Sequence, residues 1–107
     1  MDDVLARLHV TEEQIGAFCR TWAVVRFELF GSALREDFDA ESDVDVLVTF
    51  APTARVSIST LIHMEDALKA ILGRDVDVVE RRAVESNPNW IRRRNILNSA
   101  QLVYAAA

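Results

Sequence analysis

The stretch DVDVLVTF at residues 43–50 has the clearest strand pattern of the 107-residue chain. Valine recurs at every second position from Val44 to Val48, so these side chains leave one face of a strand. The opposite face begins with Asp43 and Asp45, although aspartate is depleted in strands. Both acids therefore point to one side of a strand whose other side belongs to a hydrophobic core.

Regular elements are predicted on both sides of this strand. A capping box opens a helix at Thr11, and Gly73 stands where the glycine that ends a helix belongs. The expected elements are helices over 11–22, 33–38, 57–72 and 89–99, a helical stretch from Arg81, strands over 24–30, 43–50 and 75–80, and a terminal strand or tail at 102–104. This order predicts an α/β or α+β fold, a small mixed β-sheet flanked by helices. Periodicity alone does not order the strands.

Length and composition limit the class of protein. A chain of 107 residues fits one domain, so residues 1–107 are expected to form a single domain. Its 12 Lys and Arg against 17 Asp and Glu give a net charge of −5, which argues against direct nucleic-acid binding. The start Met1-Asp2-Asp3 is unlike a signal peptide, no apolar run is long enough to span a bilayer, and a single Cys19 excludes an internal disulfide. We therefore expect a cytoplasmic protein with no membrane partner.

A second pair of acids repeats the pattern of the first. Asp75 and Asp77 lie two residues apart in the next predicted strand. Neighbouring carboxylates repel one another, and a divalent cation relieves that repulsion. Mg²⁺ prefers hard oxygen ligands and is usually held by one or two carboxylates together with substrate phosphates and water. A lone Asp-x-Asp is typical of a strand start, but the combination of acids on two strands favours a metal site.

A glycine and a serine follow the strand over 24–30. Gly31 allows a phosphate to approach the backbone closely, and the short helix expected after Ser32 offers free N–H groups at its start. Together with the acids at Asp43 and Asp45, this arrangement fits a nucleoside triphosphate bound by its phosphate tail.

These residues resemble a known family. The pattern Gly31-Ser32, ten residues, then Asp43-x-Asp45, with Asp77 on a later strand, resembles the polymerase-β-type nucleotidyltransferase superfamily. The runs LFGS and SDVDVLV and the small size are similar to the minimal nucleotidyltransferase (MNT) domains. The resemblance covers residues 27–104.

The resemblance implies roles for the acids and for the phosphate loop. Asp43, Asp45 and Asp77 would be the catalytic residues and the ligands of two Mg²⁺ ions, with Asp77 helping to activate the attacking hydroxyl. The nucleotide-binding residues would be Gly31, Ser32 and Arg35. ATP would be attacked at its α-phosphorus, giving an AMP ester and pyrophosphate.

The resemblance also implies a partner. By its resemblance to the minimal nucleotidyltransferases, this chain would be an antitoxin that transfers AMP from ATP to a tyrosine of a HEPN-domain ribonuclease toxin. Two alternatives stay open: an antitoxin that occludes the toxin without catalysis, and a nucleotidyltransferase that modifies a small molecule. The latter is disfavoured because no residues are left for an acceptor domain.

Several further residues permit two interpretations. The basic islands at 81–82 and 92–94 are either solvated helix faces or contacts to the nucleotide or to an acidic partner surface. Trp22 and Trp90 are predicted to be packing residues rather than a platform for a base. Tyr104 is predicted to pack at the chain terminus rather than to accept AMP.

Overall fold

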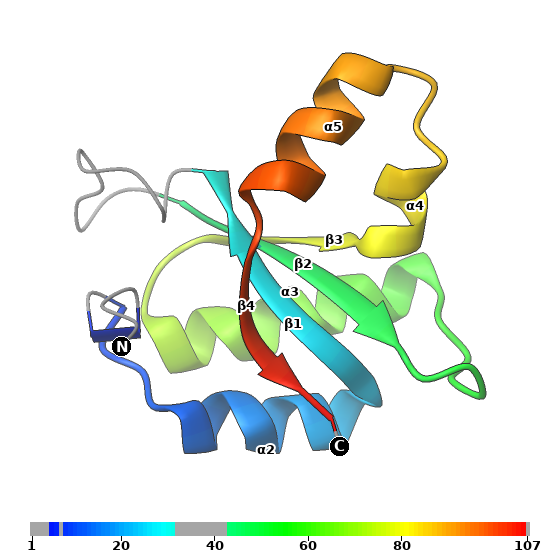
Figure 1. The fold of residues 1–107 in the computed structure, drawn as a ribbon. Coiled ribbons are helices and arrows are strands. Elements are labelled where there is room, and N and C mark those ends of the chain that lie inside the picture. Colours follow the sequence, from blue (N-terminus) through cyan, green and yellow to red (C-terminus); the bar gives the residue numbers. More distant parts are fainter. Residues whose placement is uncertain (1–4, 7, 32–42, 107) are drawn as a thin grey trace.

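The structure is a computed structural model that describes residues 5, 6, 8–31 and 43–106. Eight helices and strands within these residues follow one another along the chain (Figure 1). They are α2 (Glu12–Trp22), β1 (Val24–Phe30), β2 (Val44–Phe50), α3 (Ile58–Leu72), β3 (Val76–Glu80), α4 (Arg81–Glu85), α5 (Trp90–Ser99) and β4 (Gln101–Ala105). The elements expected from the sequence are therefore confirmed, except that the helix expected over 33–38 lies outside the described residues.

One four-stranded mixed sheet forms the centre of the molecule. Its strand order is β3-β2-β1-β4, with β1 antiparallel to both β2 and β4, and β2 parallel to β3. The parallel pair is connected through α3, because parallel strands cannot be joined by a tight turn. The chain terminus adds β4 beside β1, so a strand, rather than a tail, is found there.

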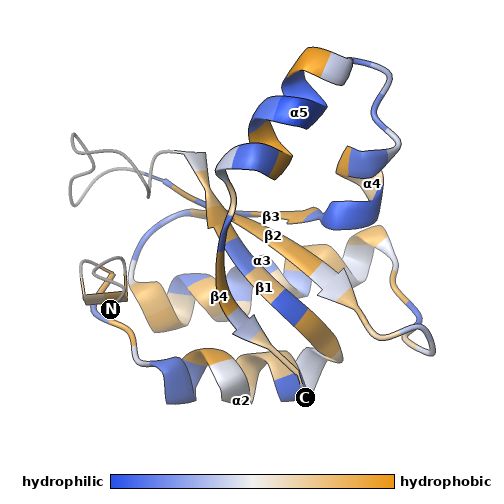
Figure 2. Cartoon of the chain, viewed as in Figure 1, coloured by the Kyte–Doolittle hydropathy of each residue, from blue (hydrophilic) through white to orange (hydrophobic). Residues whose placement is uncertain are grey.

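One layer of helices lies on each side of the sheet. Figure 1 shows α2 and α3 along one side, whereas α4 and α5 stand on the other. The core lies between the sheet and the first pair of helices, and its fully buried side chains include Ile15, Cys19, Phe27, Leu29, Val44, Val46, Val48, Met64 and Leu68. Figure 2 shows the same division, with largely hydrophobic strands and a strongly hydrophilic middle of α5. The second face of the sheet carries polar as well as apolar residues, among them Glu28, Asp45, Leu47 and Val79.

Local hydrogen bonds set the ends of the two core helices. Thr11 and Gln14 form a capping box, in which Gln14 N donates to Thr11 Oγ1 at 3.1 Å and Thr11 N donates to Gln14 Oε1 at 2.9 Å. The second core helix, α3, ends at Gly73, which has a φ of 70°, the left-handed conformation in which glycine commonly ends helices.

The β3 edge of the sheet receives a side-chain partner from α3. Val78 N donates to Glu65 Oε2 at 2.9 Å. An unpaired N–H on an edge strand attracts other chains, and this carboxylate satisfies it from within the fold. Across the described ranges, no helix has both the length and the apolar character needed to span a bilayer.

Candidate active site

Asp45 and Asp77 are neighbours across the parallel pair of strands. Asp45 of β2 is in register with Asp77 of β3, and Phe30 at the end of β1 is in register with Asp45 from the other side. Residues in register on parallel strands project from the same face of a sheet. Two acids that lie 32 positions apart in the sequence are thus placed side by side, on the face that carries α4 and α5.

Both acids line a cavity of about 270 Å³ between the sheet and the α4–α5 region. The strands contribute the two carboxylates, and the helical side contributes one guanidinium together with apolar side chains. The lining residues are Phe30, Asp45, Asp77, Val79, Ala83, Val84, Asn87, Arg92 and Ile96. Such a cavity combines charged groups for a polar ligand with apolar walls that exclude water.

Gly31 brings its backbone directly against one of these carboxylates. Its φ is 70°, a conformation that L side chains rarely adopt. A β-carbon placed on it would also overlap Oδ2 of Asp45. The position therefore requires glycine both for its backbone conformation and for the close approach to Asp45.

The other predicted site residues are placed differently. Asp43 directly precedes β2, is exposed and is not part of the cavity lining. Ser32 and Arg35 lie outside the described residues, so their predicted roles stay predictions. Within ranges 8–31 and 43–106, no group of three or more acidic, histidine or cysteine side chains is close enough to hold a metal ion. Of the three predicted acids, Asp45 and Asp77 are the two that meet at the cavity.

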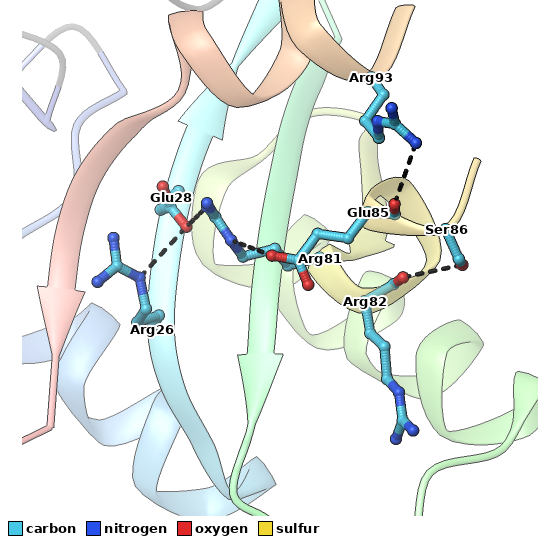
Figure 3. A network of polar contacts seen from close by, with 7 residues as sticks. All are labelled: Arg26, Glu28, Arg81, Arg82, Glu85, Ser86 and Arg93. Carbon is cyan, nitrogen blue, oxygen red and sulfur yellow. Dashed lines mark hydrogen bonds and ion pairs between the residues drawn. The ribbon is translucent and has the colours of Figure 1, made fainter. Parts of the chain in front are cut away.

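A buried ion pair fastens α4 to the sheet on this face (Figure 3). Arg81 Nη1 donates to Glu28 Oε1 at 2.7 Å, and Glu28 is only 3% exposed. Arg26 Nε lies 3.5 Å from the same oxygen, and Arg81 Nε reaches Oε2 of Glu85 at 3.4 Å. Sequence analysis missed Glu28, although an acid between aromatic and aliphatic residues of a strand was an available signal.

Hydrogen bonds to the backbone hold the start of α5. Arg93 Nη1 donates to the carbonyl oxygens of Glu85 at 3.5 Å and Asn87 at 3.3 Å. Asn89 caps the helix, because its Oδ1 accepts from the backbone N–H of Arg92 at 3.1 Å. The two basic islands thus contain structural arginines, a third role beside the two considered from the sequence.

The three predictions for large aromatic residues had different outcomes. Trp22 packs against the core, where its ring centroid lies 6.3 Å from that of Phe18, and partly buried Tyr104 also packs there, as predicted. The prediction for Trp90 was wrong, because this residue is 57% exposed. The reason is that α5 buries none of its side chains fully.

The fold and this pair of acids agree with a match to a family model. The model described as "Nucleotidyltransferase domain" matches residues 11–103, which include every described strand except the last two residues of β4. The chain therefore belongs to the nucleotidyltransferase domain family.

Two curated relatives match part of the chain. The protein adenylyltransferase MntA of Thermococcus cleftensis is 38% identical over 58 residues, which make up 54% of this chain and 57% of that protein. A protein of Methanocaldococcus jannaschii, named as a candidate protein adenylyltransferase, is 31% identical over 65 residues, or 61% of this chain and 65% of that protein. The alignments thus span less than two thirds of these curated relatives.

Solved structures share the fold. A candidate minimal nucleotidyltransferase has a TM-score of 0.65 and 29% identity, and the match covers 94% of each chain. A toxin–antitoxin crystal structure with AMP-PNP gives a TM-score of 0.70 at 21% identity, covering 91% of this chain and 75% of that one. A chain in the complex of tri-AMPylated Shewanella oneidensis HEPN toxin with MNT antitoxin gives 0.61 at 21% identity, covering 89% and 70%. The mixed sheet with its helices is therefore the fold of a minimal nucleotidyltransferase.

Proposed function

We propose that this chain is an antitoxin that transfers AMP from ATP to a tyrosine of a HEPN ribonuclease toxin and thereby neutralises it. The observation that carries the proposal is the side-by-side placement of Asp45 and Asp77 at a cavity that Gly31 borders. The adenylyltransferase names of the two curated relatives support the reaction. The AMPylated HEPN toxin named for one structural neighbour supports the acceptor.

The donor set at the cavity fits Mg²⁺. Two adjacent carboxylates offer hard oxygen ligands, and substrate phosphates and water can supply the remaining positions of an octahedral site. Asp45 and Asp77 would hold the ions, with Asp43 as the third ligand that the family pattern implies. When bound, two Mg²⁺ ions would stabilise charge on the attacking and leaving oxygens of the transfer.

The residues of this chain would bind and orient the reactants. Gly31, Ser32 and Arg35 would hold the phosphate tail of ATP, and Asp77 would accept the proton of the acceptor hydroxyl. The acceptor oxygen forms a bond to the α-phosphorus while the bond from that phosphorus to the bridging oxygen breaks. The products are an AMP ester on the acceptor and pyrophosphate.

The partner and the setting follow from the same proposal. The described elements share one sheet and one core, which supports a single minimal nucleotidyltransferase domain over residues 1–107. Since such a domain holds its nucleotide at the sheet, a partner protein would supply the acceptor surface. A need for ATP and Mg²⁺ and a buried free thiol at Cys19 fit a cytoplasmic location.

Intact-mass spectrometry tests the proposal. The chain is incubated with a candidate HEPN toxin from the same organism, ATP and Mg²⁺, and the mass of the HEPN protein is measured. We expect mass gains in steps of one AMP, which are lost with Asp45→Asn or Asp77→Asn because charge and metal affinity fall while side-chain shape is kept. The matched control is Asp66→Asn, an exposed acid on α3 that should transfer AMP normally.

The alternatives predict different results. A stable complex that blocks the ribonuclease without any mass gain would contradict AMP transfer and favour occlusion. Transfer to a small hydroxyl compound but not to the HEPN protein would favour the small-molecule alternative.

A further inference from the structure

We propose that Arg92 binds the phosphate groups of the nucleotide from the helix side of the cavity, an inference that rests on the function proposed above. Arg92 is the one cationic side chain among the described residues that line the cavity with Asp45 and Asp77. Two carboxylates repel a triphosphate, and a guanidinium facing the same space attracts it. Arg92 therefore complements the acids at the place where a nucleotide has to be accommodated.

The side chain of Arg92 is available for a ligand. This side chain forms no ion pair or hydrogen bond in the described parts of the chain, whereas the backbone N–H of Arg92 donates to Asn89 Oδ1. Arg81 and Arg93 differ, because each is bound to groups that hold α4 and α5 in place. Of Arg81, Arg92 and Arg93, the arginine that lines the cavity is thus the one whose side chain makes no structural contact in the described parts of the chain.

The position of Arg92 is nevertheless fixed through its backbone. It lies in the first turn of α5, which Asn89 caps and which Arg93 ties to the carbonyl oxygens of Glu85 and Asn87. The Arg81–Glu28 ion pair in turn anchors α4 to the sheet (Figure 3). A charged group carried by an anchored helix loses less conformational entropy on binding than one carried by a free loop.

The guanidinium group suits phosphate in particular. It presents a planar fork of N–H donors that can bind two phosphate oxygens at once. Its contribution should therefore depend on the phosphates of the ligand and not on its base or ribose. This property separates nucleotide binding by Arg92 from a contact to the acceptor protein.

Calorimetric titration of the full chain, without any acceptor protein, tests the inference. The probes are ATP with Mg²⁺ and adenosine, and the variants are Arg92→Ala and Arg94→Ala. Arg94 is the matched control because it is an exposed arginine on the same helix that does not line the cavity. We expect Arg92→Ala to weaken ATP binding about tenfold or more while Arg94→Ala changes it less than about twofold. Adenosine affinity should be the same in all three proteins, and Arg92→Lys should restore part of the ATP affinity.

Other outcomes would overturn the inference. Equal losses for Arg92→Ala and Arg94→Ala would mean that only net charge matters. Unchanged ATP binding in Arg92→Ala, with slower AMP transfer to the HEPN protein, would place Arg92 at the acceptor instead. If ATP binding depends on Arg92 but the wild-type chain transfers no AMP, the inference holds and the function proposed above is the part that fails.

Discussion

The backbone of Gly31 lies directly against the carboxylate of Asp45. A β-carbon on residue 31 would overlap Oδ2 of Asp45, and Gly31 already has a φ of 70°. The backbone directly after β1, at Gly31, is therefore pressed against an acid of the candidate active site. This contact links the phosphate-binding glycine expected from the sequence to one of the carboxylates that it is expected to serve.

Replacing Gly31 by alanine should destabilise the protein for two separate reasons. The left-handed conformation costs an L residue about 1–2 kcal/mol, and the overlap with Asp45 adds a further cost because the carboxylate has to move. We expect the free energy of unfolding, measured by urea denaturation, to fall by more than about 2 kcal/mol. AMP transfer should fall as well.

Gly73 provides the matched control for this prediction. It has the same φ of 70°, but nothing lies within 4 Å of the place where its β-carbon would be. Gly73→Ala should therefore show the conformational cost alone, and Asp45→Ala should recover part of the loss caused by Gly31→Ala. Equal losses at both glycines would show that contact with Asp45 costs nothing.

The Glu28–Arg81 ion pair should be important for stability. Removing Arg81 leaves Arg26, whose Nε lies 3.5 Å away, as the remaining ion-pair partner of the buried Glu28 carboxylate among the described residues. Breaking a buried pair in this way typically costs about 3 kcal/mol, because a charge stays buried without its main partner. We expect Arg81→Ala to lower the free energy of unfolding by about this amount in urea denaturation.

The neighbouring arginine tests whether the effect belongs to the pair. Arg82 is exposed, and Figure 3 shows its side chain pointing away from Glu28, with only its backbone carbonyl bonded to Ser86. Arg82→Ala should change the free energy of unfolding by less than about 0.5 kcal/mol. Similar losses in the two variants would indicate a general effect of charge or helix propensity.

Local features of the fold could be predicted from the sequence, whereas its long-range pairings could not. The capping residue Thr11, the terminal Gly73 and the alternation over 43–50 act within a few residues, and the structure confirms each of them. The neighbourhood of Asp45 and Asp77 depends on the parallel register of β2 and β3, two strands that are separated in the sequence by α3. Strand periodicity carries no information on that register.

The ion pair between Glu28 and Arg81 and the exposure of Trp90 on α5 were not predicted, for related reasons. Glu28 and Arg81 are 53 positions apart, so no local pattern connects them. Trp90 was expected to pack because tryptophan is largely apolar, but burial depends on whether another element covers the helix. Among the described elements, none buries a residue of α5 fully.

The thiol of Cys19 should make stability depend on pH in the alkaline range. Burial raises the pKa of this thiol from 9.0 to about 12, and the charge of Arg20 opposes the increase only in part. Above pH 9 the unfolded chain therefore loses a proton that the folded protein keeps. The free energy of unfolding should fall by about 1.4 kcal/mol per pH unit from this group between pH 9.5 and 11.

Comparison with Cys19→Ala isolates this contribution from the effects of pH on the rest of the chain. Urea denaturation under reducing conditions at pH 7, 9, 10 and 11 gives the free energy of unfolding of both proteins. The wild type should be the more stable protein at pH 7, and its advantage should shrink at each step above pH 9. A constant difference between the two curves would show that the folded protein does not hold the thiol proton.

Repulsion between Asp45 and Asp77 should lower the free energy of unfolding of the metal-free protein. Asp45 and Asp77 are in register on adjacent strands, and like charges that lie directly opposite one another are destabilising. In EDTA, Asp77→Asn should therefore have a slightly higher free energy of unfolding than the wild type.

Millimolar Mg²⁺ should stabilise the wild type, because a ligand that binds only the folded state raises its stability. It should stabilise Asp77→Asn much less. Thermal unfolding with EDTA, Mg²⁺ or Mg²⁺ with ATP measures both effects, and Asp66→Asn on α3 should respond to Mg²⁺ as the wild type does. An equal gain from Mg²⁺ in the wild type and in Asp77→Asn would mean that the metal binds elsewhere, and the two acids would then need another explanation.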